Sequence, residues 1–212
     1  MPAAEPSAAA PQAAEAPVDR ILTAANAFTA LRLACIPVVA LLLVRDHGSD
    51  REAAAWLLAA LGATDWVDGQ LARRLHQVSS LGKVLDPLAD RLLLATAAVT
   101  SIAVGAVPVW VAVAALVREA VVAVGFVYVA AAGGRRMDVN LAGKAATFLL
   151  MVALPLFIIG HSRASWHGAG EAAAWVPVLP ALVLGWVSTI AYVGPARRLV
   201  AEGRVGRAAP AQ

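Results

Sequence analysis

Residues 65–90, DWVDGQLARRLHQVSSLGKVLDPLAD, place four aspartates in a chain that is otherwise strongly apolar. Asp65 and Asp68 are three residues apart, and Asp86 and Asp90 are four residues apart. On a helix, either spacing puts both carboxylates on one face. We therefore expect two helix ends joined by a tight turn, which would bring the two aspartate pairs to one place.

The composition around this stretch is typical of a membrane protein. Of the 212 residues, 60% are hydrophobic and 15% are charged, and the mean hydropathy is +0.73. Soluble domains are usually about 45–50% apolar and about 25% charged. We predict an all-α membrane protein with six transmembrane helices and a short N-terminal amphipathic helix at residues 18–25.

The apolar stretches also predict the domain organisation. Crossing about 30 Å of hydrocarbon takes roughly 20 helical residues. The predicted spans are residues 26–44, 52–75, 83–105, 108–131, 141–160 and 172–193. Residues 1–16, an Ala/Pro tract, are predicted to be a disordered tail, residues 17–200 one transmembrane domain, and residues 201–212 a basic cytoplasmic tail.

The basic residues predict how the chain is oriented. With six spans, one side of the membrane receives Arg20, Arg73, Arg74, Lys83, Arg135, Arg136, Arg197, Arg198, Arg204 and Arg207. The other side receives Arg45, Arg51 and Arg163. The positive-inside rule therefore places both termini and the aspartate stretch in the cytoplasm, with the chain in the inner or plasma membrane. The net charge of +3 favours contact with membrane lipids, and no nucleic-acid partner is expected.

Four converging carboxylates would repel one another unless cations lay between them. A charge near the bilayer centre costs about 2.5–3.5 kcal/mol, so such a cluster indicates function. Oxygen ligands favour Mg²⁺, Mn²⁺ or Ca²⁺, and Mg²⁺ commonly shares its coordination with phosphate. Gly69, Ala72 and Gly82 leave room for a ligand, and Arg73 offers a guanidinium fork to a phosphate oxygen. The stretch therefore predicts a metal site for a phosphate-bearing substrate.

The pattern Asp65-x2-Asp68-Gly69-x2-Ala72-Arg73-x8-Gly82-x3-Asp86-x3-Asp90 resembles, at every fixed position, the signature of the CDP-alcohol phosphatidyltransferases. A looser resemblance extends over residues 20–195. It implies a six-helix membrane enzyme, usually a homodimer, that binds a CDP-linked lipid. In such an enzyme the hydroxyl of an acceptor alcohol attacks the lipid-side phosphorus of CDP-diacylglycerol, and CMP leaves.

The resemblance also implies roles for individual residues. Asp65, Asp68 and Asp86 would hold two divalent cations, Mg²⁺ or Mn²⁺. Asp90 would join them and act as the general base on the acceptor hydroxyl. The residues implied to contact the nucleotide and its diphosphate are Gly69, Ala72, Arg73, Ser79, Gly82 and Asn26.

The acceptor pocket is expected to use charges on the later spans. Arg118 and Glu119 stand in the fourth, in LVREAVV, and two interpretations are open. Arg118 either pairs with Glu119 or binds the phosphate of the acceptor, helped by Lys144 and by Arg135 or Arg136 at the cytoplasmic rim.

The identity of the acceptor is left open between two alcohols. The segments NAFTALRLACIPVVALL and GKAATF resemble the branch that contains phosphatidylglycerophosphate synthases and CDP-dependent cardiolipin synthases. Glycerophosphate-using bacterial members usually carry a second arginine about two turns after the first, where this chain has Phe126. Glycerol 3-phosphate and phosphatidylglycerol are therefore both candidates.

Two further features of the sequence allow more than one interpretation. Arg32, with Thr29 in the first span, indicates either a structural polar contact or a contact with a lipid headgroup. The rival function is a transporter or cation channel with a cation-binding aspartate cluster. The aspartates are expected at one membrane face rather than at the midplane, where transporters bind their ions, and this favours the enzyme.

Overall fold

The computed structural model describes residues 24–45, 49–75, 82–133 and 140–208. Within these ranges, the side chains of residues 24–26, 65–75, 82–84, 86, 87 and 202–208 are not described. The described chain forms six helices. They are α1 (Ala24–Arg45), α2 (Asp50–Leu75), α3 (Gly82–Ala103), α4 (Val109–Ala131), α5 (Leu141–Gly160) and α6 (His167–Ala208).

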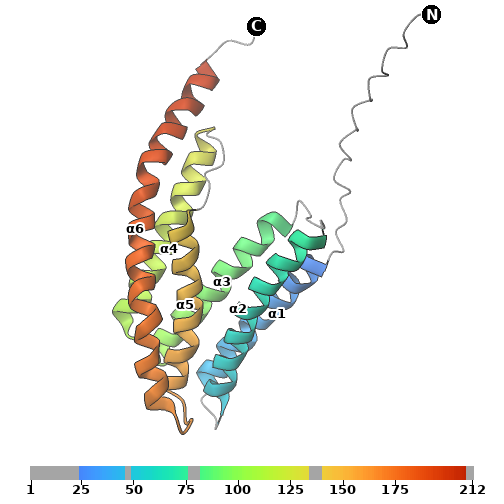
Figure 1. Ribbon diagram of the computed structural model, residues 1–212, viewed down its shortest axis with the longest axis vertical. Helices are drawn as coiled ribbons and strands as arrows, with labels where there is room; N and C mark the ends of the chain where they lie inside the picture. The colour runs from blue at the N-terminus through green and yellow to red at the C-terminus, as the bar shows by residue number, and fades with distance from the viewer. Residues whose placement is uncertain (1–23, 46–48, 76–81, 134–139, 209–212) are drawn as a thin grey trace, which may run out of the picture.

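The helices form two neighbouring groups, as Figure 1 shows. α1 packs against both α2 and α3, while α5 packs closely along α6. α5 also contacts α2 and so joins the two groups. The start of α1, the end of α2 and the start of α3 lie at one end of the molecule, which also holds the end of α4 and the start of α5 (Figure 1). This end holds the helix segments that carry the aspartate motif.

The turn chemistry of the sequence explains where two of the helices end. Gly105, after α3, has a φ of 70°, and Gly133, after α4, has a φ of 79°. Both lie in the left-handed region that glycine adopts without a steric penalty. Pro108 then precedes α4 with a φ of −54°, which fits the fixed geometry of its ring. The predicted span ends at residues 105 and 131 and the predicted start at residue 108 lie within two residues of the observed helix ends.

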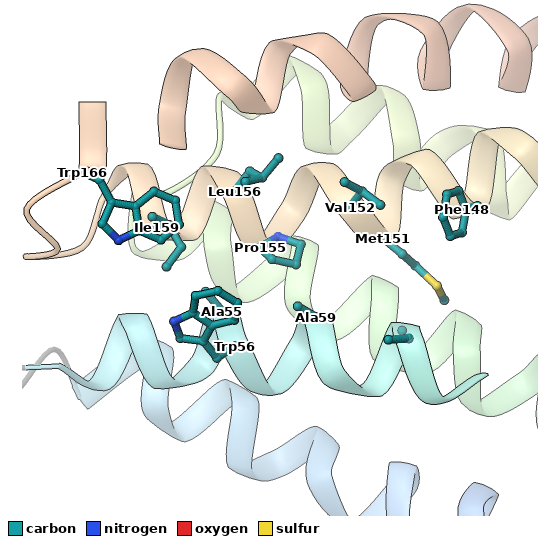
Figure 2. A pocket seen from close by; sticks show the side chains of 12 residues that line it. Ala55, Trp56, Ala59, Phe148, Met151, Val152, Pro155, Leu156, Ile159 and Trp166 are labelled. Carbon is teal, nitrogen blue, oxygen red and sulfur yellow. The ribbon is translucent and has the colours of Figure 1, made fainter. Parts of the chain in front are cut away.

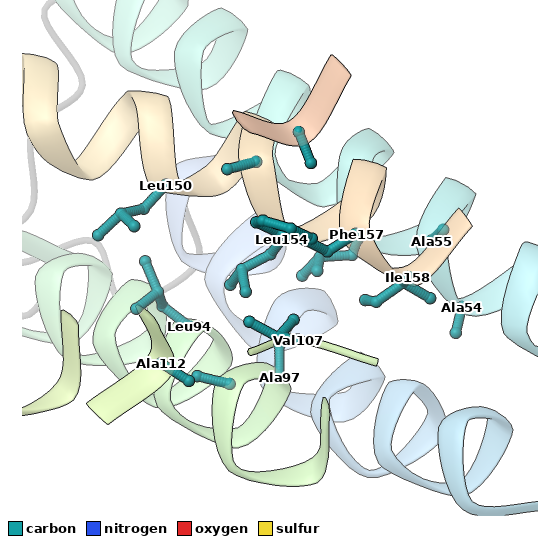
Figure 3. Packing of buried hydrophobic residues seen from close by; sticks show 14 of the residues in the cluster. Ala54, Ala55, Leu94, Ala97, Val107, Ala112, Leu150, Leu154, Phe157 and Ile158 are labelled. Carbon is teal, nitrogen blue, oxygen red and sulfur yellow. The ribbon is translucent and has the colours of Figure 1, made fainter. Parts of the chain in front are cut away.

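The hydrophobic core surrounds α5, and its buried residues come from all six helices. Figure 3 shows Leu154, Phe157 and Ile158 of α5 packed toward Ala97 of α3 and Val107, just before α4. Small side chains on the facing helices let the backbones approach closely, which is the usual way that membrane helices associate. The core therefore holds α5 as the central helix of the bundle.

The all-helical class is confirmed, and several helices fit a multi-pass membrane protein. Within the described residues, α1, α4, α5 and α6 each contain a stretch that is long and apolar enough to cross a membrane. Many of their large apolar side chains are exposed, as expected for surfaces that face lipid. The six-span count, which also requires α2 and α3 to cross, stays a prediction.

The last helix is longer than the span predicted at residues 172–193. α6 has 42 residues and continues through Pro195. Proline removes one backbone hydrogen bond, but alanine and arginine, which favour helix, are frequent among the residues that follow. At about 1.5 Å per residue the helix is roughly 63 Å long, more than a bilayer needs. Figure 1 shows its C-terminal part extending beyond the other helices. Most of the amphipathic segment predicted at residues 18–25 lies outside the described residues.

Candidate active site

Asp90 is the motif aspartate whose side chain the structure describes, and it is paired with Arg32. Arg32 Nη1, on α1, donates to Asp90 Oδ1, on α3. The Arg32 side chain is 4% exposed and that of Asp90 is 21% exposed. Burying either charge without its partner would cost roughly several kcal/mol, so each side chain stabilises the other in its buried position. Of the two interpretations of Arg32, the structure therefore supports a polar contact within the protein rather than a contact with a lipid headgroup.

The other three aspartates are described only as parts of helix backbones. Asp65 and Asp68 lie ten and seven residues before Leu75, the end of α2, and Asp86 lies four residues after Gly82, the start of α3. At about 1.5 Å per residue, these positions lie roughly 6–15 Å along their helices from that end of the molecule. Among the side chains that are described, no group of three or more His, Cys, Asp or Glu gathers. The metal cluster therefore stays a prediction.

All six predicted nucleotide contacts also lie outside the described side chains. Gly69, Ala72 and Arg73 belong to the last turns of α2, Gly82 begins α3, and Asn26 lies in the first turn of α1. Ser79, Arg135 and Arg136 lie outside the described residues altogether. Their predicted roles are carried forward as proposals.

Arg118 is buried in α4, where its guanidinium joins three helices. Nη1 donates to the Glu119 carboxylate and lies 3.4 Å from Thr147 Oγ1 on α5. Nη2 donates to the Gly143 carbonyl at 3.5 Å, and Nε donates to the Gly185 carbonyl of α6 at 3.5 Å. The ion pair with Glu119, one of the two interpretations drawn from the sequence, is present. The fork is held in one orientation by groups on α4, α5 and α6.

A layer of charged side chains connects this arginine to the aspartate motif. Arg91, the residue after Asp90, has its Nε 3.8 Å from Oε2 of Glu119. Glu119 therefore lies between two arginines. We refer to Arg32, Asp90, Arg91, Glu119 and Arg118 as the charged layer; with three arginines and two carboxylates its formal charge is +1. It crosses α1, α3 and α4; the Arg91 side chain is 41% exposed, whereas the other four side chains are largely buried.

Two glycines make room for the Arg118 side chain. A Cβ at Gly143 would lie 2.8 Å from Ser188 Oγ and 3.3 Å from Arg118 Nη2, and one at Gly185 would lie 3.3 Å from Arg118 Nε. Sequence reasoning did not find these roles. The sequence did contain one indication of them. Glycine inside a helix is less stable than alanine by about 1 kcal/mol, so a glycine within an apolar helix often indicates close packing. Lys144, the next residue along α5, is exposed.

A polar network at the start of α5 holds an aromatic pair. The Asn140 side-chain oxygen caps the helix by accepting from the Gly143 backbone N–H and from the Ser188 hydroxyl, both at 2.7 Å. The Asn140 backbone N–H donates to the Tyr192 hydroxyl at 2.8 Å. The Tyr192 ring meets Phe126 edge-on, with ring centroids 5.8 Å apart. Phe126, at the position where the resemblance implied a second arginine in most glycerophosphate-using members, therefore packs against an aromatic ring.

An apolar groove runs between α2 and α5 (Figure 2). Its volume is about 290 Å³. Trp56 and Trp166 stand at one end, and Phe148 and Met151 lie toward the other. The α2 side of the lining ends at Ala63, two residues before Asp65. The groove therefore leads along α2 toward the motif. Its lining consists of Ala55, Trp56, Ala59, Gly62, Ala63, Phe148, Met151, Val152, Pro155, Leu156, Ile159 and Trp166.

Buried charges inside an apolar helical bundle mark a functional site of a membrane protein. The fold and the charged layer fit a membrane-embedded enzyme or a transporter. Comparison with known proteins separates the two. A family model described as CDP-alcohol phosphatidyltransferase matches residues 22–191.

Three relatives illustrate the similarity. A cardiolipin synthase (CMP-forming) of Streptomyces coelicolor is 35% identical over 185 residues, which cover 86% of each chain. A probable phosphatidylglycerophosphate synthase of Mycobacterium tuberculosis is 34% identical over 182 residues, 84% of each chain. A CDP-diacylglycerol–glycerol-3-phosphate 3-phosphatidyltransferase of Bacillus subtilis is 31% identical over 176 residues, 76% of this chain and 90% of that protein.

The chain belongs to the CDP-alcohol phosphatidyltransferase family. It is a membrane enzyme of phospholipid biosynthesis that moves the phosphatidyl group of CDP-diacylglycerol to an acceptor alcohol. The prediction of family and reaction is confirmed, and the transporter alternative is set aside.

Proposed function

We propose that the acceptor is phosphatidylglycerol, so that the products are cardiolipin and CMP. The observation that carries this choice is the edge-on contact of Phe126 with Tyr192. A phosphate monoester such as glycerol 3-phosphate carries about −1.5 to −2 charges at pH 7 and calls for several cations. The phosphodiester of phosphatidylglycerol carries one negative charge and therefore needs fewer cations. Its diacylglycerol part is apolar, so an aromatic pair fits beside phosphatidylglycerol better than beside glycerol 3-phosphate. The name of the Streptomyces coelicolor relative agrees with this acceptor.

The acceptor phosphate is proposed to bind Arg118, with Lys144 and Arg135 or Arg136 nearer the rim. The Arg118 fork is oriented by the Gly143 and Gly185 carbonyls, so little side-chain freedom would be lost when a phosphate binds. The charged layer also has a positive formal charge, which favours an anionic acceptor.

Glycerol 3-phosphate is the second candidate acceptor. It is favoured by Arg118 itself, a buried cation near the start of α5, and by the names of the Mycobacterium tuberculosis and Bacillus subtilis relatives. In this alternative, Lys144 and the rim arginines would supply the charge that Phe126 does not.

We propose that Asp65, Asp68, Asp86 and Asp90 hold two divalent cations, Mg²⁺ or Mn²⁺. Carboxylate oxygens are the ligands that these ions prefer, and the four positions lie within a few turns of the same end of the bundle. When bound, the two ions would neutralise the diphosphate and stabilise the entering and leaving oxygens.

The reacting proton is assigned to Asp90. Its carboxylate would accept the proton of the acceptor hydroxyl as that oxygen forms a bond to the lipid-side phosphorus. The bond from this phosphorus to the bridging oxygen of the diphosphate breaks, and the electron pair leaves with CMP. Asp90 suits the role because it is partly exposed while a buried arginine orients it.

The donor is proposed to lie along α2. Its nucleotide and diphosphate would contact the residues named for them in the motif, Gly69, Ala72, Arg73, Ser79 and Gly82, together with Asn26. The apolar groove would take one acyl chain. It is lined by apolar side chains and runs toward Asp65, as a chain attached to the reacting phosphate requires.

We also propose a homodimer in the cell membrane, with both termini and the active site in the cytoplasm. The family resemblance supports the dimer, and the distribution of basic residues supports the orientation. The described ends of the chain, the start of α1 and the end of α6, lie at the same end of the bundle, as an even number of spans requires (Figure 1).

The assignment is tested with purified protein in lipid, Mg²⁺ or Mn²⁺, CDP-diacylglycerol and each acceptor supplied separately. CMP release should require both the cation and phosphatidylglycerol. Asp90→Asn should keep nucleotide binding and lose about 100-fold or more in turnover, because a general base typically contributes 10²–10⁴-fold. Asp68→Asn should also lose the cation-dependent binding. Full activity in either variant would overturn the assigned roles.

A further inference from the structure

Arg32 occupies an unusual place for an arginine in an apolar helix. Its residue exposure is 3%, and Thr29, one turn earlier on the same face of α1, is buried to the same degree. The neighbouring apolar side chains Leu31 and Leu33 are exposed. The polar face of α1 is therefore turned into the bundle, toward α3, while apolar side chains cover the outside.

The Arg32–Asp90 pair links α1 and α3 at the same height in the bundle. Arg32 is eight residues after Ala24, the start of α1, and Asp90 is eight residues after Gly82, the start of α3. Both positions are therefore about 12 Å along their helices from the motif end of the bundle. Because a lone buried charge is costly, any sliding of one helix past the other would be opposed by the loss of this pair.

We infer that Arg32 is a positioning residue for Asp90, a role that rests on the proposed function of Asp90 as the general base. A base works only within hydrogen-bond reach of the proton it accepts, about 2.6–3.2 Å between heavy atoms. The Arg32 guanidinium donates to the Asp90 carboxylate from a buried position and thereby restricts its rotamer. Arg32 acts on the reaction through this carboxylate, with no contact to substrate required.

The kinetic consequence is a loss of turnover without a loss of donor binding. Displacing a reacting group by about 1 Å can cost about 100-fold, so Arg32→Met should lower kcat by about 10- to 100-fold. The KM for CDP-diacylglycerol should stay unchanged. Arg32→Lys keeps the charge but has no planar fork, so its kcat should lie between those of Arg32→Met and the unchanged enzyme.

A matched control is available at the other end of the bundle. Arg51, at the start of α2, is half-buried and donates from Nη1 to the His161 carbonyl at 2.9 Å. Arg51→Met removes a comparable cross-helix contact far from the motif. It should lower thermal stability while leaving kcat unchanged. All rates are referred to the amount of folded protein, measured by size-exclusion chromatography and by CDP binding.

The decisive experiment is a double-mutant cycle with Asp90→Asn. If Arg32 acts through Asp90, adding Arg32→Met to Asp90→Asn should lower the residual CMP release no further. Independent, multiplying losses, or full kcat in Arg32→Met, would overturn the positioning role. If Arg32→Met does not fold, Arg32→Lys decides the question, because a kcat equal to that of the unchanged enzyme contradicts the role.

The cycle also separates this inference from the proposed function. If Asp90→Asn itself keeps full turnover, the general-base assignment fails and the positioning role fails with it. If Asp90→Asn loses turnover while Arg32→Met does not, the general base stands and the positioning role alone is wrong.

Discussion

Gly143 lies so close to Arg118 that a Cβ on this glycine would be 3.3 Å from Arg118 Nη2. The same Cβ would be 2.8 Å from the Ser188 hydroxyl oxygen, which donates to the cap of α5. The absence of a side chain at Gly143 thus leaves the space that the Arg118 guanidinium occupies. It also keeps the helix cap and the Ser188 contact of α6 intact.

Gly143→Ala should destabilise the protein by about 1–3 kcal/mol, the usual range for overpacking a core. The new methyl group would displace the Ser188 hydroxyl and loosen the cap at Asn140. Gly125→Ala on α4 is the matched control, because no atom lies within 4 Å of the Cβ it would add. Thermal unfolding in detergent should show a lower Tm for Gly143→Ala and an equal or higher Tm for Gly125→Ala. Equal Tm values for both variants would contradict the close packing.

The two interpretations of Arg118 can be separated by removing its partner as well. Arg118→Met should cost about 3–5 kcal/mol, because it breaks a buried pair and leaves the Glu119 charge poorly compensated. Adding Glu119→Gln removes that charge and should restore much of the lost stability. If Arg118 binds the acceptor, the double variant keeps a raised KM for phosphatidylglycerol. A double variant that recovers both its Tm and its KM would show that Arg118 serves only the ion pair.

The aromatic pair should influence which alcohol is accepted. Phe126→Arg would place a second cation about two turns after Arg118, and a charge-assisted hydrogen bond contributes about 1.5–3 kcal/mol. The ratio of kcat/KM for glycerol 3-phosphate to that for phosphatidylglycerol should therefore rise about 10-fold or more. Phe126→Leu, which removes the ring without adding charge, should raise this ratio less than Phe126→Arg does. An equal change in both variants would show that the added charge has no role.

Filling the apolar groove with a larger side chain should weaken the binding of donors with long acyl chains more than that of donors with short ones. Ala59 lines the groove, whereas Ala60 is exposed and is not part of its lining. Ala59→Phe should raise the KM for long-chain CDP-diacylglycerol and affect a short-chain donor much less, because only a long chain would reach the filled part. Ala60→Phe should leave both values unchanged. If Ala59→Phe raises both KM values equally, the groove does not hold an acyl chain.

The helices could be predicted from the sequence because their signals are local. Apolar length, together with turn residues such as Gly105, Pro108 and Gly133, placed most boundaries within a few residues of those observed. The extent of α6 was the main difference. The predicted span ended at residue 193, just before Gly194 and Pro195, yet the helical preference of the residues that follow carries the helix to Ala208. The motif spacing was likewise enough to predict the family.

The contacts between distant residues could not be predicted in this way. Arg32 and Asp90 are 58 positions apart, and no periodicity in either helix indicates that they meet. Tyr192 was not singled out because its partner Phe126 lies on another helix. Such pairs depend on the rotation and relative height of packed helices, which are set by the whole core around α5 rather than by any one segment.

The most direct test of the account is a competition between the two acceptors. Purified enzyme in vesicles that contain CDP-diacylglycerol and phosphatidylglycerol is supplied with glycerol 3-phosphate and Mg²⁺, and the lipid products are identified by mass. With both acceptors present, the product ratio reports the ratio of kcat/KM values multiplied by the ratio of acceptor concentrations. Cardiolipin should be the main product, with CMP formed in equal amount. Phosphatidylglycerophosphate as the main product, at comparable acceptor concentrations, would contradict the account.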